Sequence, residues 1–171
     1  AEGVDMGFSK NVLSGAAVAA AFALSATVVP MATAAGNSSA TGGGTTEEAG
    51  ATSTFVFNAV RGKNGNVTGH LVYHVRGWPV TIMMDLDCLI VEGNTAKMSG
   101  VVTQVSEEYP GLIFVGQDAT FMVEDNGQGA NAGPDMFSDL FLEPGASCDD
   151  PRLGTDPFVP YLPVRGNIQV R

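Results

Sequence analysis

Apolar and polar residues alternate one by one in short segments along the chain after residue 52. The clearest segment is 80–88, in which every second residue is apolar: Val80, Ile82, Met84, Leu86 and Cys88. Successive side chains of a β-strand point to opposite faces, so this alternation is typical of strands that bury one face. No window after residue 52 sustains the 3.6-residue period of an amphipathic helix. The pattern therefore predicts an all-β fold.

Turn signals divide this region into short segments. Asn64-Gly65-Asn66, Gly93-Asn94 and Tyr109-Pro110-Gly111 combine residues that favour tight turns. The expected strands are 54–60, 67–75, 80–88, 89–103 with an internal turn at Gly93, 112–115, 119–123, 136–142 and 166–171. Short strands at this spacing predict an antiparallel β-sandwich or a small β-barrel of about eight strands.

The beginning of the chain has the pattern of a secretion signal. Five residues precede the first methionine, Met6, and Lys10 then supplies one positive charge. An uncharged, Ala-rich run covers residues 12–29, and the small residues Ala32-Thr33-Ala34 form a typical cleavage site. We therefore expect residues 1–34 to be an N-terminal extension and signal peptide, cleaved after Ala34. An uncleaved membrane anchor is the alternative, because the run has the minimum length for spanning a bilayer.

Two further boundaries follow from composition. Residues 35–51 contain no large apolar residue and are dominated by Gly, Ser and Thr, which predicts a flexible linker. Residues 52–171 then form the β domain. Within this domain Pro151, Pro157, Pro160 and Pro163 mark residues 149–165 as an extended segment that crosses the sheet before the last strand. The alternative is an extended ligand segment that binds an aromatic groove of a partner.

The charge balance limits the kinds of partner. The chain carries 18 Asp and Glu against 8 Lys and Arg, for a net charge of −10. Too few cations are present to neutralise phosphates, which excludes nucleic-acid binding. The acidity also opposes adhesion to anionic membranes after removal of the signal. We therefore expect an extracellular or cell-wall ligand.

Cys88 and Cys148 are the only two cysteines. An even number of cysteines in an exported chain favours a disulfide, and closing a loop of about 60 residues would stabilise the fold by about 4 kcal/mol. Two free buried thiols are the alternative if the chain is not exported. Two sulfurs without His at a suitable spacing form no zinc pattern. The sequence therefore predicts a Cys88–Cys148 disulfide.

The richest polar stretch is the Gly-rich segment 124–135. Glu124, Asp125 and Asp135 would offer the hard oxygen ligands that calcium prefers. The spacing departs from that of an EF-hand, because Gly127 and Gly129 occupy positions that need ligands. The alternative is a turn shaped by Asx capping and by the conformational freedom of glycine. Calcium is the only cofactor that the sequence suggests, and these three carboxylates are its candidate ligands.

Two pairs of residues resemble parts of catalytic or metal sites. Asp85 and Asp87 lie about 7 Å apart on one strand face, and such carboxylate pairs cleave glycosides. A solvated outer face is the alternative reading for them. His70 and His74 would be separated by about 13 Å on a strand, too far to share one ion, so we expect them at the surface. No nucleophile elbow, P-loop or dinucleotide fingerprint is present in the sequence.

Several short motifs recur as a set in one group of proteins. They lie within the domain at 69–73, 87–96, 98–101, 123–129, 134–135 and 166–170. In these motifs and in its two cysteines the chain resembles an uncharacterised group of small secreted bacterial all-β domains. The resemblance covers most of the β domain and implies a β fold and export. It implies no activity.

Together these patterns favour an exported, non-catalytic β module that acts in extracellular or cell-envelope binding or structure. Two alternatives stay open. A secreted, carbohydrate-active hydrolase would use Asp85 and Asp87, with Trp78 as a stacking residue. A calcium-stabilised adhesion module would be centred on Asp125 and Asp135.

Overall fold

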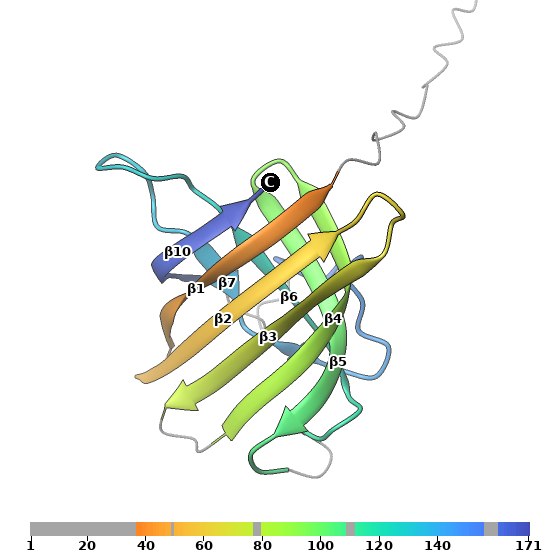
Figure 1. Cartoon of the computed structure of the whole chain (residues 1–171). Coiled ribbons are helices and arrows are strands. Elements are labelled where there is room, and N and C mark those ends of the chain that lie inside the picture. The colour runs from red at the N-terminus through yellow and green to blue at the C-terminus, as the bar shows by residue number, and fades with distance from the viewer. Residues whose placement is uncertain (1–36, 49, 77–79, 109–111, 156–160) are drawn as a thin grey trace, which may run out of the picture. The chain divides into compact units, whose positions relative to one another are not determined.

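The computed structural model describes residues 37–48, 50–76, 80–108, 112–155 and 161–171, and it is all-β in these ranges (Figure 1). The prediction of an antiparallel all-β fold is confirmed, with ten strands in place of about eight. The predicted signal peptide lies outside the described residues. Among the described residues no helix is long and apolar enough to cross a membrane. The strands are β1 Ser38–Glu48, β2 Ala51–Arg61, β3 Val67–Arg76, β4 Val80–Glu92, β5 Thr95–Val105, β6 Asp118–Glu124, β7 Met136–Ser138, β8 Phe141–Leu142, β9 Tyr161–Pro163 and β10 Arg165–Val170.

The strands form one antiparallel sheet that curls into a nearly closed barrel. β1 to β6 follow one another as neighbours, β7 and then β9 continue the sheet beyond β6, and the short β8 also pairs with β6. The last segment joins the two ends of this sheet. β9 pairs with β7, and after one residue, Val164, β10 pairs with β1. Figure 1 shows β10, β1, β2 and β3 side by side, with β6 and β7 behind them.

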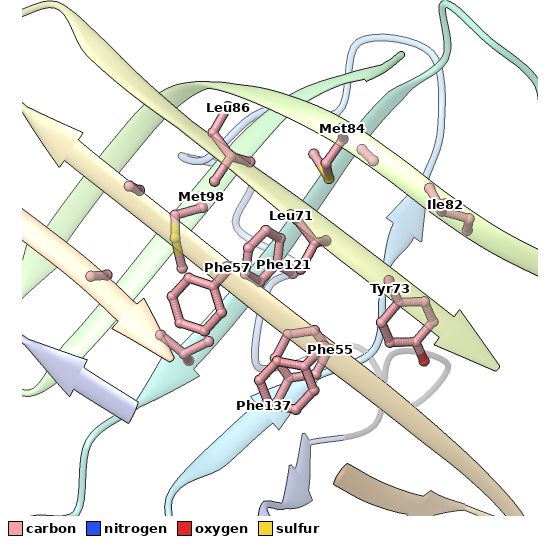
Figure 2. Packing of buried hydrophobic residues seen from close by; sticks show 14 of the residues in the cluster. Phe55, Phe57, Leu71, Tyr73, Ile82, Met84, Leu86, Met98, Phe121 and Phe137 are labelled. Atoms are coloured by element: carbon pink, nitrogen blue, oxygen red, sulfur yellow. The ribbon is translucent and has the colours of Figure 1, made fainter. Parts of the chain in front are cut away.

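Aromatic side chains fill the inside of the barrel (Figure 2). Phe137 of β7 stacks on Phe55 of β2, with ring centroids 4.0 Å apart, and Phe121 of β6 lies 5.4 Å from Phe137. Phe57 meets the Phe121 ring edge-on at 5.6 Å. Aliphatic and methionine side chains from β3, β4 and β5 complete the cluster: Leu71, Ile82, Met84, Leu86 and Met98. The apolar residues of the alternating pattern therefore point inward, where they pack against one another as the core of the barrel.

β1 lies in the region that composition predicts to be a flexible linker, residues 35–51. That prediction is wrong for Ser38–Glu48, which pairs with β2 along its whole length and with β10 along half of it. The inward positions of β1 are small because its neighbours fill the space. Gly42 lies directly between Phe57 and Ile168, and a Cβ atom there would be 2.9 Å from both side chains. Small residues in this strand therefore reflect close packing, and the folded domain begins before residue 52.

A β-bulge changes the faces of β4 at its centre. The register shifts between Leu86 and Cys88, so that Cys88 pairs with Ser99 and Leu89 pairs with the buried Met98. Leu89 consequently enters the core, and Cys88 lies on the outer face of the sheet. Strict alternation predicts that Cys88 points into the core. This prediction is wrong, because the extra residue of the bulge moves every later side chain of β4 to the opposite face of the sheet.

Three other segments differ in detail from the predictions. Residues 112–115 form a loop with a single bridge at Ile113, and residues 136–142 form the two short strands β7 and β8. The Pro-rich segment 149–165 continues in turns to Thr155 and includes β9. Its residues 156–160 lie outside the described ranges.

Candidate functional site

Two carboxylates of the polar segment 124–135 attach the β6–β7 loop to the last strand. Asp135 accepts a hydrogen bond from the backbone N–H of Ile168 at 2.7 Å, and Asp125 accepts one from Val170 at 3.1 Å. Residues two apart in a strand point their N–H groups to the same edge. β10 uses its other edge to pair with β1. The two carboxylates therefore satisfy the edge of β10 that no backbone strand covers.

The second oxygen of each carboxylate holds the loop itself. Asp125 accepts a hydrogen bond from Gly127 N and Asp135 accepts one from Asn126 N, both at 2.9 Å. The backbone carbonyl of Asp135 also accepts a hydrogen bond from Val164 N, the residue between β9 and β10. All four carboxylate oxygens thus have backbone N–H partners. Asp125 and Asp135 close the barrel where main-chain pairing stops.

Glu124, the third candidate calcium ligand, belongs to a different set of contacts. It ends β6, and its Oε1 lies 3.4 Å from Asn94 Nδ2 of the β4–β5 turn. Burial, followed by the charge of Glu124, raises the pKa of the Tyr161 phenol. Among the residues that the structure describes, no group of three or more His, Cys, Asp or Glu side chains is arranged to hold one metal ion. The contact of Asp125 with Gly127 N is the i to i+2 hydrogen bond of an Asx turn, whereas Asp135 bonds to residues 9 and 33 positions away in the sequence.

The other candidate residues from the sequence lie on the outside of the barrel. Asp85 and Asp87 are exposed, and Asp85 pairs across the sheet with the exposed His70. The Nδ1 atom of His74 lies 3.0 Å from Thr81 Oγ1, so His74 contacts a neighbouring strand and not His70. The bulge at Asp87 changes the strand geometry from which the 7 Å separation of the two carboxylates was predicted. Trp78 lies outside the described residues.

The predicted disulfide Cys88–Cys148 is present, with its Cα atoms 6.0 Å apart. It joins the outer face of β4 to the segment 143–155, which covers part of the outer face of β6. Gly145 N donates a hydrogen bond to Asp118 at the start of β6, at 2.7 Å. Apolar side chains are buried between this segment and the sheet, separate from the barrel core: Met122, Ala146, Cys148 and Leu153. The disulfide therefore fastens a second, smaller apolar layer to the barrel.

Arg152 organises this covering segment. Its guanidinium donates hydrogen bonds to Asp150 and Glu143, at 2.7 and 2.9 Å for the closest atoms, and lies 4.1 Å from the centre of the Phe141 ring. The hydrogen bonds from the Arg152 side chain, followed by that from its backbone N–H, lower the pKa of Asp150. Asp150 and Glu143 in turn raise the pKa of Arg152. The sequence gives little sign of this cluster, because its members are brought together by turns.

One buried polar contact inside the barrel was not predicted. The Tyr73 hydroxyl lies 2.7 Å from Asp139 Oδ1 and 3.0 Å from Ser53 Oγ. The alternation of β3 predicts that Tyr73 points inward, and a buried phenol needs a hydrogen-bond partner. Asp139 is the residue directly after β7, which ends at Ser138. This contact links β2, β3 and the β7–β8 connection.

Comparison of the chain with family models, with curated proteins and with solved structures found no match.

Proposed function

We propose that this chain is an exported, non-catalytic β module that acts outside the cytoplasm, in binding or in the structure of the cell envelope. The proposal rests on the observation that groups of the chain itself occupy both the polar loop and the barrel interior. The loop carboxylates hold β10, and the chain's own aromatic side chains occupy the barrel. A ligand of such a molecule would bind to its outer surface.

The disulfide supports the part of this proposal that places the protein outside the cytoplasm. A disulfide between residues 88 and 148 is consistent with an oxidising compartment. The signal-like sequence of residues 1–34 points in the same direction. The expected ligand is extracellular or part of the cell wall, and the module needs no bound cofactor in this proposal.

Export is tested by expressing the full chain in a bacterium and separating the cell fractions. We expect the protein outside the cytoplasm, with Ala35 as its first residue and with both cysteines resistant to alkylation until a reductant is added. Cytoplasmic protein with two reactive thiols would contradict the proposal. An exported protein with an intact N-terminus would indicate the anchor alternative.

The non-catalytic part is tested with glycoside, ester and peptide substrates. We expect no turnover above that of a buffer control. Turnover that is abolished in Asp85→Asn or Asp87→Asn, and retained in the exposed control Asp149→Asn, would contradict the proposal and support the hydrolase alternative.

A further inference from the structure

The loop between β5 and β6 carries three exposed apolar side chains within four residues. Leu112 is 63% exposed, Val115 is 51% exposed and Phe114 is 37% exposed. We call these three residues the apolar tip. Isolated exposed apolar residues are common, but a cluster on one short loop is typical of a contact surface.

The backbone of the apolar tip is held in place from both sides. Ile113, between Leu112 and Phe114, is buried in the barrel core. The buried side chain of Gln117 accepts a hydrogen bond from Phe114 N at 3.3 Å, and Gly116 N donates to the carbonyl of Val102 in β5 at 2.8 Å. The exposed side chains are thus presented on a fixed backbone. Little conformational entropy of the loop backbone is then lost when a partner binds these side chains, which favours binding.

The surroundings of the apolar tip are acidic. Glu107 and Glu108 are exposed in the loop just after β5, and Glu108 Oε1 lies 3.4 Å from Val115 N. A second copy of this chain or an anionic membrane would bring like charges to the apolar tip, which opposes both as occupants. A partner with cationic side chains would be attracted.

We propose that the apolar tip is the docking surface for a partner protein that presents an apolar pocket surrounded by Lys or Arg side chains. This inference rests on the proposed function as a binding module and specifies the surface used. Leu112, Phe114 and Val115 fill the pocket, and Glu107 and Glu108 pair with the cations at its rim.

The test uses cyclodextrins as soluble apolar pockets with a rim of chosen charge. The full chain is titrated with amino-substituted, unsubstituted and carboxymethyl-substituted β-cyclodextrin, and NMR shifts report the dissociation constants. We expect the amino-substituted form to bind about tenfold more tightly than the carboxymethyl form at low salt, with the difference decreasing as salt is added. The largest shifts should occur at Leu112, Phe114 and Val115.

Two variants make the test specific. Leu112→Ser/Phe114→Ser/Val115→Ser should lose binding. The matched control Val56→Ser/Val60→Ser/Met83→Ser, which changes three exposed apolar residues on β2 and β4, should keep it. Glu107→Gln/Glu108→Gln should lose the preference for the amino-substituted form and retain binding to the unsubstituted form. Unchanged thermal unfolding shows that each variant is folded.

Several results would overturn the inference. Equal binding of all three cyclodextrins would remove Glu107 and Glu108 as the recognised charges and with them the cationic partner. Equal binding by the triple tip variant would remove the apolar tip as the recognition surface. Tip-dependent binding to phosphatidylcholine vesicles would identify a membrane as the occupant, and tip-dependent dimerisation would identify a second copy. None of these results changes the export or turnover measurements, so the proposed function is judged separately.

Discussion

At the scale of the residue, small side chains and carboxylates determine how the two ends of the sheet meet. Gly42 and Gly44 of β1 leave room for side chains of neighbouring strands. A Cβ atom at Gly44 would lie 2.7 Å from both the Arg165 carbonyl oxygen and Val164 Cγ1. Asp135 then provides a side-chain acceptor at the edge that β1 does not reach. The closure therefore depends on residues that a hydrophobic pattern does not reveal.

The first prediction concerns the inward side of β1. Gly42→Val places a side chain between Phe57 and Ile168, and we expect this overpacking to lower the free energy of unfolding by about 1–3 kcal/mol. Gly43→Val is the matched control on the outward side, where a Cβ atom would lie 3.2 Å from Phe55 O and 3.6 Å from Val56, farther than the 2.9 Å contacts at Gly42. Urea denaturation compares the two variants. An equal effect of both would show that β1 does not pack as described.

The second prediction concerns Asp135. Asp135→Ala removes the acceptor for Ile168 N and Asn126 N, and we expect a cost of about 1–3 kcal/mol for each amide that stays unpaired. Hydrogen exchange at Ile168 should accelerate more than exchange in the β3–β4 ladder. Asp87→Ala, at an exposed position, should change stability by about 0.5 kcal/mol or less. Unchanged exchange at Ile168 would contradict the bridging role of Asp135.

At the scale of the element, the covering segment 143–155 is held to the barrel by a disulfide, a hydrogen bond and apolar contacts. The disulfide joins it to β4, and Gly145 N donates a hydrogen bond to Asp118 of β6. Leu153 is buried outside the barrel core. The sequence predicts the disulfide but not the face of the sheet on which it lies, because the bulge before Cys88 turns the later side chains of β4 to the opposite face. The extra residue in β4 thus turns Cys88 toward the covering segment.

The third prediction concerns this layer. The double variant Cys88→Ser/Cys148→Ser should lower the free energy of unfolding by about 4 kcal/mol, because the unfolded chain loses a 60-residue covalent constraint. Hydrogen exchange should increase most in residues 143–155. Ala130→Ser, an exposed substitution in another loop, serves as the control. Uniform acceleration over the whole barrel, without an excess in 143–155, would contradict a local fastening role.

The fourth prediction gives the pH dependence of the same segment. Arg152 holds the pKa of Asp150 below its ordinary value of 3.8. A carboxyl with a lowered folded-state pKa stabilises the fold above its unfolded-state value, and this contribution is lost as pH falls through the folded-state pKa. We expect Arg152→Gln to be less stable than the original chain at neutral pH, with the difference shrinking below about pH 3.8. Urea denaturation over a pH series checks this. A difference that is independent of pH would contradict it.

At the scale of the whole molecule, periodicity predicts the fold class and most strands from β2 onward. It fails where partners distant in the sequence determine the conformation. β1 has no large apolar residue because Phe57 and Ile168 fill its face, and Cys88 changes face because of a bulge. The polar loop can be recognised in the sequence as a cluster of acids and glycines. Its role depends on β10, about 40 residues away, which local spacing does not contain.

The central claim is that Asp125 and Asp135 close a disulfide-fastened barrel, and we propose that they do so without calcium. Thermal unfolding of the full chain, with calcium or a chelator and with or without reductant, tests it most directly. We predict a transition temperature that changes by less than about 2 °C between calcium and chelator and falls by about 10–20 °C on reduction. A clear rise with calcium, lost in Asp125→Asn and Asp135→Asn, would contradict the claim and make the loop a metal site.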